Sequence, residues 1–216
     1  MISIKLNERE RARRLNRAID QALLEPGSDD AAKLRELGGR PSPVELAERV
    51  RRRAARLGAR SRRVPERRDA LMAALYASAA PPGWFNAWCD GSSSRTPPGG
   101  AGVGGVVMDP GGRVVARLAR CHADLDPFAA EIGALAAVLK AALKAGAGRI
   151  RVHTDCVALA RLWRARRSDP RLDSVRALSR GFEAFVIRAI PRSHNQTAHV
   201  LAREAIASLK KPVGFD

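Results

Sequence analysis

The change of sequence pattern at Trp84 constrains the fold of this chain more than any other feature. From Trp84 to Cys89 bulky and small residues alternate as in a half-buried strand, whereas the preceding residues show helical periodicity. Two more strands are expected on either side of the Asp-Pro-Gly-Gly turn at 109–112. In chain order, the expected elements are strands 84–89, 103–108 and 113–119, a helix 126–145, a strand 150–153, helices 156–167 and 172–181, a strand 185–190 and a helix 195–209.

This order of elements predicts an α/β domain over residues 83–210. Three strands in succession form a meander, and the later alternation of strands with helices adds parallel neighbours. The expected architecture is therefore a mixed sheet flanked by helices.

Residues 1–80 predict a separate, small, all-helical region. Leu15, Ile19 and Leu23 fall on one stripe of a helix, and the segment 42–45 reads Ser-Pro-Val-Glu, a capping box with proline at the first helical position. Further helices are expected over 31–37 and 66–79. Arginine runs in this region either bind nucleic acid, support a protein contact, or form an ordinary solvated face.

The charge balance favours a polyanionic partner. The chain holds 39 Lys and Arg against 22 Asp and Glu, a net charge of +17. Basic side chains that approach phosphates release condensed counterions, which drives binding to nucleic acid. A compositional bias toward arginine is the alternative explanation.

Three features bear on the cellular compartment. The chain has no uncharged apolar run of about 18 residues, which a membrane span requires. Its first residues become charged too early for a secretory signal. Cys89, Cys121 and Cys156 show no C-x-x-C spacing, which argues against a zinc knuckle and suits a reducing compartment. We therefore expect a cytoplasmic protein.

Three carboxylates in the second half stand where a sheet could bring them together. Asp90 is expected to end the first strand, Asp155 ends the fourth, and Glu131 lies in the first turns of an apolar helix. Hard cations such as Mg²⁺ prefer oxygen ligands of this kind, and a pair of ions can promote phosphodiester hydrolysis. Taken singly, the three residues could instead start a turn, offset a helix dipole and cap a helix.

Four segments in this order resemble those of ribonuclease H domains. They are Trp88–Ser92, Ala130–Leu135, His153–Cys156 and Asn195–Ala202, with a glycine-rich strand after the first. The resemblance covers about residues 83–210 and implies the ribonuclease H fold, a five-stranded mixed sheet in which only the second strand is reversed. It further implies Mg²⁺-dependent cleavage of the RNA strand of RNA–DNA hybrids, leaving 5′-phosphate and 3′-hydroxyl ends.

The resemblance also implies roles for individual residues. Asp90 would bridge two metal ions, and Glu131 and Asp155 would each help to hold one. His199 stands where the family usually has a fourth carboxylate, and imidazole suits Mn²⁺ better than Mg²⁺. His199 is expected to be a metal ligand or to position water, the alternative being a helix-start residue without a metal role.

Other positions are expected to contact the hybrid. The family motifs and the basic segments together point to Gly91, Ser92, Asn195, Arg161, Arg164 and Arg192. Arg161 and Arg164 belong to a basic cluster with Arg166, Arg167 and Arg171, in which Trp163 could stack on an arginine. The alternative for this cluster is an ordinary solvated helix face. Arg192 or His194 could assist product release. The family's asparagine ahead of the glycine-rich strand is replaced by Pro97, which removes one expected contact to the RNA strand.

The glycine-rich segment 100–105 also satisfies G-x-G-x-x-G, the pattern of a dinucleotide site. Such a site needs a helix immediately afterwards, but a strand and a turn follow here. The glycines are therefore expected to admit a nucleic-acid backbone or to mark bulges. The favoured hypothesis is a ribonuclease H-type endonuclease; the alternatives are a binding module with weak or lost catalysis, and a nuclease acting on DNA junctions.

Overall fold

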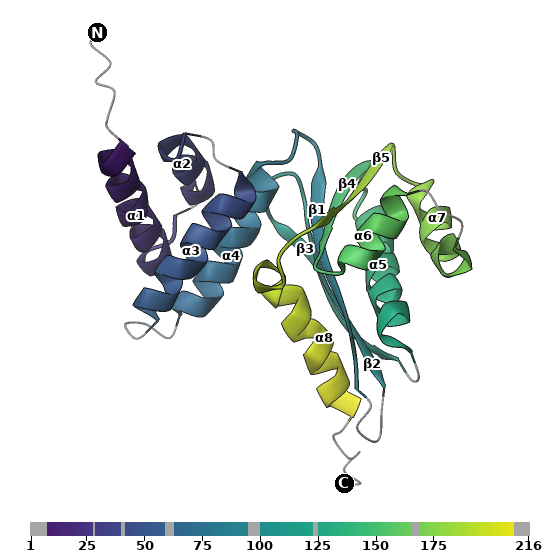
Figure 1. The fold of residues 1–216 in the computed structure, drawn as a ribbon. Coiled ribbons are helices and arrows are strands. Elements are labelled where there is room, and N and C mark those ends of the chain that lie inside the picture. Colours follow the sequence, from purple (N-terminus) through teal and green to yellow (C-terminus); the bar gives the residue numbers. More distant parts are fainter. Residues whose placement is uncertain are drawn as a thin grey trace. The chain divides into compact units, whose positions relative to one another are not determined.

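The chain forms two compact units, Met1–Ala79 and Ala80–Asp216, in the computed structural model (Figure 1). The structure describes residues 8–27, 29–39, 42–58, 63–94, 100–122, 125–165 and 169–209. No helix within these ranges is both long and apolar enough to cross a membrane. Each unit has its own buried core.

The first unit is helical, as expected. Its helices are α1 (Glu8–Leu24), α2 (Asp30–Leu37), α3 (Pro43–Leu57) and α4 (Val64–Ser78). The capping box is present at the start of α3: the Ser42 hydroxyl accepts a hydrogen bond from the Glu45 amide at 3.2 Å, and the Glu45 carboxylate accepts from the Ser42 amide at 2.9 Å. These two bonds satisfy backbone donors that the first turn of a helix leaves without partners.

The second unit contains a five-stranded mixed sheet in the order β3-β2-β1-β4-β5 (Figure 1). The strands are β1 (Phe85–Ser93), β2 (Ala101–Met108), β3 (Val114–His122), β4 (Arg149–Thr154) and β5 (Ala184–Ala189). β2 runs antiparallel to both β1 and β3, while β4 pairs in parallel with β1 and β5. The predicted sheet, with only its second strand reversed, is confirmed.

Helices cover the two faces of this sheet. They are α5 (Pro127–Lys144), α6 (Val157–Arg164), α7 (Asp173–Ser179) and α8 (Gln196–Leu209), with short 3₁₀ turns η1 (Pro170–Leu172) and η2 (Arg192–His194). The Asp126 carboxylate caps α5 by accepting from the amides of Phe128 and Ala129 at 2.8 and 2.9 Å. The apolar side chains of α5, such as Leu135 and Leu139, are fully buried in the core between α5 and one face of the sheet.

The glycines of β2 admit helices, not nucleic acid. A Cβ on Gly104 would stand 2.2 Å from the backbone oxygen of Ala198, and one on Gly102 would stand 1.9 Å from that of Ala202, both in α8. A Cβ on Gly105, which points to the opposite face, would meet a methyl group of Val138 in α5 at 2.4 Å. The expectation of a nucleic-acid approach here was wrong, because β2 is buried along its whole length between two helices.

One strand end also differs from expectation. β1 does not stop at Asp90 but continues to Ser93, because Asp90 to Ser93 pair with Gly104 to Ala101 of β2. Asp90 is therefore a residue within a strand and not the start of a turn. The irregularity in β2 falls between Val107 and Met108, outside the glycines that were expected to mark bulges.

Candidate active site

The three carboxylates come together because of the register between β1 and β4. These strands are parallel neighbours in which Trp88 stands opposite His153. Asp90 lies two residues after Trp88 in β1, and Asp155 lies two residues after His153, just past the end of β4. Because side chains alternate with a period of two, both carboxylates lie on the same side of the sheet at the same level. Both side chains are buried, with 1% of Asp90 and 7% of Asp155 exposed.

Gly91 brings the third carboxylate into the same place. A Cβ on Gly91 would lie 2.2 Å from the backbone nitrogen of Glu131, so only glycine lets α5 approach β1 this closely. The Gly91 amide donates to Glu131 Oε2 at 3.2 Å, which orients that side chain. The structure thus assigns Gly91 a packing function. Ser92, the next residue of β1, is half-buried and pairs with Gly102.

His199 and Arg192 supply nitrogen groups beside the carboxylates. His199, in the first turns of α8, has its Nδ1 within hydrogen-bond distance of Asp90 Oδ2, at 3.0 Å. The Arg192 guanidinium lies 3.3 Å from Asp155 Oδ2 and 3.2 and 3.3 Å from the two ring nitrogens of His199. Arg192 is 63% exposed, so it can leave these partners at little cost in burial.

Asn195 holds Asp155 against β1. Its side chain is 1% exposed, and its amide nitrogen donates to the Cys89 carbonyl at 2.9 Å and to Asp155 Oδ1 at 2.5 Å. We had expected Asn195 to contact nucleic acid, but both of its amide hydrogens are used inside the protein. Sequence spacing gave no sign of this role, because the two partner atoms belong to residues 40 and 106 positions away along the chain.

The alternative structural explanations for two of the carboxylates do not hold. The N-cap of α6 is Cys156, which makes no capping bond through its side chain, so Asp155 does not cap that helix. The Cys156 amide instead donates to Thr154 Oγ1 at 3.0 Å. Glu131 is the fifth residue of α5 and binds Gly91, so it is not a free dipole partner at the helix start.

Two carboxylates of the site, Asp90 and Glu131, have a raised pKa. Burial, and then the negative charges of Asp90 and Asp155, raise the pKa of Glu131 to about 8. Burial also raises the pKa of Asp90, and the hydrogen bond from His199 partly offsets this. Buried like charges disfavour each other's ionised forms, so this cluster favours a positively charged group.

The donor chemistry of the site fits a divalent cation. Oxygen ligands dominate, and Asp90 Oδ1 is buried without a hydrogen-bond partner among the described residues. Nevertheless, within the described ranges no three His, Cys, Asp or Glu side chains are arranged as they stand to hold a metal ion. Each predicted ligand has a protein partner instead: Gly91 for Glu131, His199 for Asp90, and Asn195 with Arg192 for Asp155.

His153 lies close to these residues in the chain but is built into the sheet. It is 2% exposed, stacks on Trp88 with ring centroids 4.9 Å apart, and has Nε2 at 3.4 Å from Asn86 Oδ1. Burial lowers the pKa of His153 to about 3, with Arg151 and Arg188 adding to the effect. A histidine held neutral in this way supports the sheet without carrying charge.

The predicted basic contacts lie on and after α6. Arg161 and Arg164 are exposed on α6, and no described residue pairs with either. Trp163 packs on Phe185, with ring centroids 4.9 Å apart, and no arginine among the described residues stacks on it. Arg171 pairs with Asp169 and lies over the Phe128 ring. Pro97, Arg166 and Arg167 lie outside the described residues.

Comparisons with known proteins agree with the fold of the second unit. Residues 89–205 match a family model described as reverse transcriptase-like. The crystal structure of RNase H1 from the halophilic archaeon Halobacterium salinarum is similar, with 30% identity and a TM-score of 0.54 over 58% of this chain and 99% of that one. The N-terminal RNase H domain of a Mycobacterium tuberculosis protein shows 26% identity and a TM-score of 0.54, over 58% and 95% of the two chains.

A further solved structure shares the fold. LC11-RNase H1 in complex with an RNA/DNA hybrid has 22% identity and a TM-score of 0.52, over 59% of this chain and 99% of that one. No curated protein sequence matches the chain. All three structural matches cover less than two thirds of this chain.

Proposed function

Because the chain belongs to the ribonuclease H family, we propose that it is a metal-dependent endonuclease that cleaves the RNA strand of RNA–DNA hybrids. The observation that carries this proposal is the juxtaposition of Asp90 and Asp155 at one level of the parallel β1–β4 pair, with Glu131 beside them. A related RNase H1 has been solved in complex with an RNA/DNA hybrid, which supports this substrate class.

The proposed ligands of a divalent cation, Mg²⁺ or Mn²⁺, are Asp90, Glu131, Asp155 and His199. When bound, the metal would supply positive charge to offset the charge that develops on the phosphate during hydrolysis. The protein itself contributes a preorganised frame: β1 and β4 fix the two aspartates, and Gly91 and Asn195 orient Glu131 and Asp155. Such preorganisation lowers the cost of assembling the site at the moment of reaction.

Arg192 is proposed to change partners when substrate binds. Its guanidinium now lies on Asp155 and His199 and is largely exposed. A phosphate group of the hybrid could replace the Asp155 carboxylate, because it can also accept two hydrogen bonds from a guanidinium. Arg161 and Arg164 are proposed to add phosphate contacts that fix the position of the hybrid without reading its sequence.

The test is a cleavage assay on labelled hybrid, duplex RNA and duplex DNA, each with Mg²⁺ and with Mn²⁺. We expect cleavage of the RNA strand of the hybrid alone, giving 5′-phosphate ends. An Asp155→Asn preparation serves as the control for contaminating nuclease. Absence of hybrid cleavage with either ion would contradict the proposal, and preferential cutting of branched DNA would favour a junction nuclease.

A second candidate is a hybrid-binding module with weak or lost catalysis. It is favoured by one observation: the described carboxylates are not arranged as a metal site, and Arg192 already neutralises part of their charge. The same assay separates the two candidates when hybrid affinity is measured alongside. Tight, salt-dependent binding without turnover would select the binding module.

A further inference from the structure

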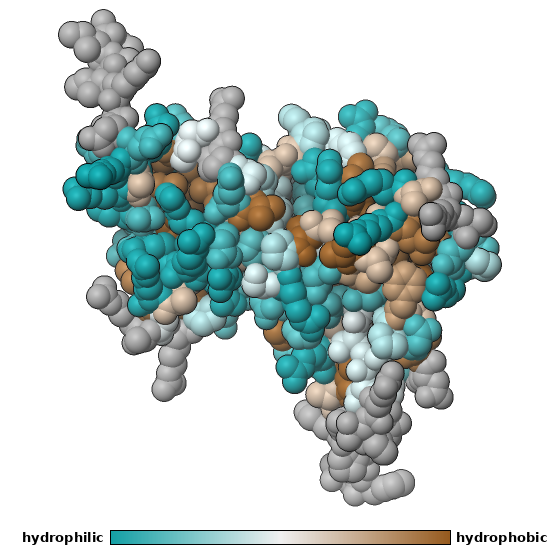
Figure 2. Space-filling view, viewed as in Figure 1, coloured by the Kyte–Doolittle hydropathy of each residue, from teal (hydrophilic) through white to brown (hydrophobic). Residues whose placement is uncertain are grey.

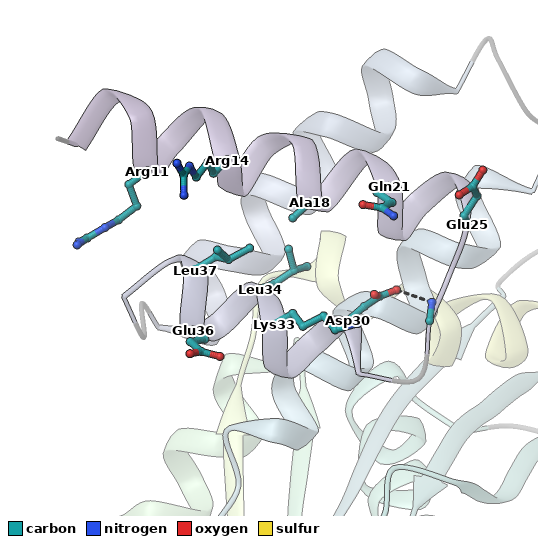
Figure 3. A pocket seen from close by; sticks show the side chains of 11 residues that line it. Arg11, Arg14, Ala18, Gln21, Glu25, Asp30, Lys33, Leu34, Glu36 and Leu37 are labelled. Carbon is teal, nitrogen blue, oxygen red and sulfur yellow. Dashed lines mark hydrogen bonds between the residues drawn. The ribbon is translucent and has the colours of Figure 1, made fainter. Parts of the chain in front are cut away.

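Among the described residues of the helical unit, two clefts have a similar size but a different charge. The first lies between α1 and α2 and has a volume of about 730 Å³ (Figure 3). Its lining combines three basic residues with three acidic ones; they are Arg11, Arg14, Lys33, Glu25, Asp30 and Glu36. Charges in this cleft therefore balance, and the Asp30 carboxylate is already used to accept from the Gly27 amide.

The second cleft lies between α1 and α3, has a volume of about 630 Å³, and is strongly basic. Four arginines of α3 line it, against two glutamates; the arginines are Arg49, Arg52, Arg53 and Arg56. Their spacing of i, i+3, i+4 and i+7 places them on one face of the helix. On the face seen in Figure 2, hydrophilic side chains gather over α3.

Acidic neighbours neutralise only part of this charge. Arg53 forms an ion pair with Asp20 of α1, with Nε 2.7 Å from Oδ1. Glu48 accepts two hydrogen bonds from Arg51, at 2.8 and 2.6 Å, and also lies 3.3 Å from Arg52. One carboxylate thus serves two arginines and offsets the charge of only one. No described residue forms an ion pair with Arg49 or Arg56.

The helix dipole does not account for the arginines. Cations stabilise the last turn of a helix, and Arg56 lies there. Arg49 and Arg52 stand further from the end of α3, where this effect has faded. Two arginines of α1 add to this charge. Arg9 and Arg13 lie on the same face of α1 as Asn16, which lines the cleft, since residues 9, 13 and 16 are four and three positions apart. Both arginines are exposed.

From this contrast we infer that the α1–α3 groove is a second nucleic-acid contact, which binds the phosphate backbone of a duplex without reading its bases. Guanidinium groups on one helical face suit phosphate oxygens, which they bind through two parallel hydrogen bonds. The groove belongs to the helical unit and contains none of the carboxylates proposed for catalysis. The inference therefore does not rest on cleavage activity.

The test uses the full chain and a short labelled DNA duplex, whose binding is measured over a range of salt concentrations. The variant Arg49→Gln/Arg52→Gln/Arg56→Gln removes three charges but keeps the Arg53–Asp20 pair. We expect its affinity to fall about tenfold or more, and the slope of log K against log salt to become shallower by about 2.7, which is about 0.9 for each lost phosphate contact. A variant with three lysines at these positions should keep most of the slope.

A charge-matched control comes from the balanced cleft. Arg11→Gln/Arg14→Gln/Lys33→Gln removes the same number of charges from the same unit, and it should leave affinity and salt slope nearly unchanged. Circular dichroism checks that each variant is folded. Equal losses in both triple variants, or no loss in the α3 variant, would overturn the inference; in the latter case the groove would fit an acidic protein partner instead.

Discussion

Single side chains at the candidate active site each serve two neighbours. Asn195 donates to a strand carbonyl and to Asp155, while Arg192 lies on Asp155 and on the ring of His199. The buried Asn195 is committed to the fold, whereas the exposed Arg192 is held only by polar contacts. Substitutions at this scale should therefore separate groups that build the site from groups that act in it.

Asp155→Asn should abolish hybrid cleavage while hybrid affinity stays nearly unchanged. The substitution keeps the size of the side chain but removes a charge proposed to hold metal, and a loss of about 10³-fold or more in kcat is expected. His199→Ala should reduce kcat by less, because imidazole is a weaker ligand for Mg²⁺ than carboxylate. Turnover rates and hybrid dissociation constants check both. Undiminished cleavage by Asp155→Asn would contradict the proposed role.

Asn195→Ala should lower both stability and turnover. It removes the hydrogen bond from Asn195 to the Cys89 carbonyl and releases Asp155, at a cost of about 1–3 kcal/mol in the free energy of unfolding. Urea unfolding measures this, with Gln196→Ala as control, since the one donor bond of Gln196 within the described ranges is an exposed one to the Arg192 carbonyl. A positioning role predicts a lower kcat at unchanged KM; a change in stability alone would limit Asn195 to structure.

At the scale of helices and strands, the contact between β2 and α8 is the most demanding one. Gly104→Ala would force a Cβ into the main chain of α8 and should destabilise the fold by about 1–3 kcal/mol or more. Gly133→Ala is the matched control, because its Cβ would meet Val103 at an ordinary 3.5 Å within a helix. It should be neutral or slightly stabilising, since alanine favours helices. Thermal unfolding of both variants checks the contrast, and equal effects would contradict it.

The same elements show how far sequence reasoning reaches. Residue alternation, turn sequences and helix caps were sufficient to predict the order of the elements. The resemblance to the family was needed to predict that the second strand is reversed. The continuation of β1 through Asp90-Gly91-Ser92-Ser93 was not predictable locally, because these residues disfavour strands and are held there by pairing with β2. The packing role of the β2 glycines and the structural role of Asn195 were not predictable for a related reason: their partners lie far away in the chain.

For the whole molecule, the acidic centre should make stability depend on pH. The pKa of Glu131 is raised to about 8 from an ordinary 4.5, so between these values the folded state binds more protons than the unfolded state. Stability from this group therefore falls as pH rises through that window. Glu131→Gln removes the effect, so its stability relative to the unaltered protein should increase with pH in this window.

Chemical unfolding of both proteins at several pH values measures this difference. Saturating Mg²⁺ should reduce it, because a bound cation favours the ionised carboxylate. Identical pH profiles for the two proteins would contradict the prediction. This readout does not depend on catalysis, so it tests the site even in a preparation that does not cleave hybrid.

The positive charge is also a property of the whole molecule. Residues 1–80 contain 19 Lys and Arg against 11 Asp and Glu, a net +8, and residues 81–216 contain 20 against 11, a net +9. The excess positive charge is therefore shared almost equally by the two halves of the chain. In the second unit, three of the 11 acids are those of the candidate active site, so an acidic centre is set in a positive surface.

The backbone contact between β2 and α8 has a consequence for sequence drift. His199 stands next to Ala198, whose carbonyl lies against Gly104, so the depth at which the imidazole meets Asp90 is fixed by main-chain atoms. A side chain at Gly102 or Gly104 would displace α8 and His199 with it, so these two positions, which contact no proposed ligand group themselves, should tolerate fewer replacements than the residues around them.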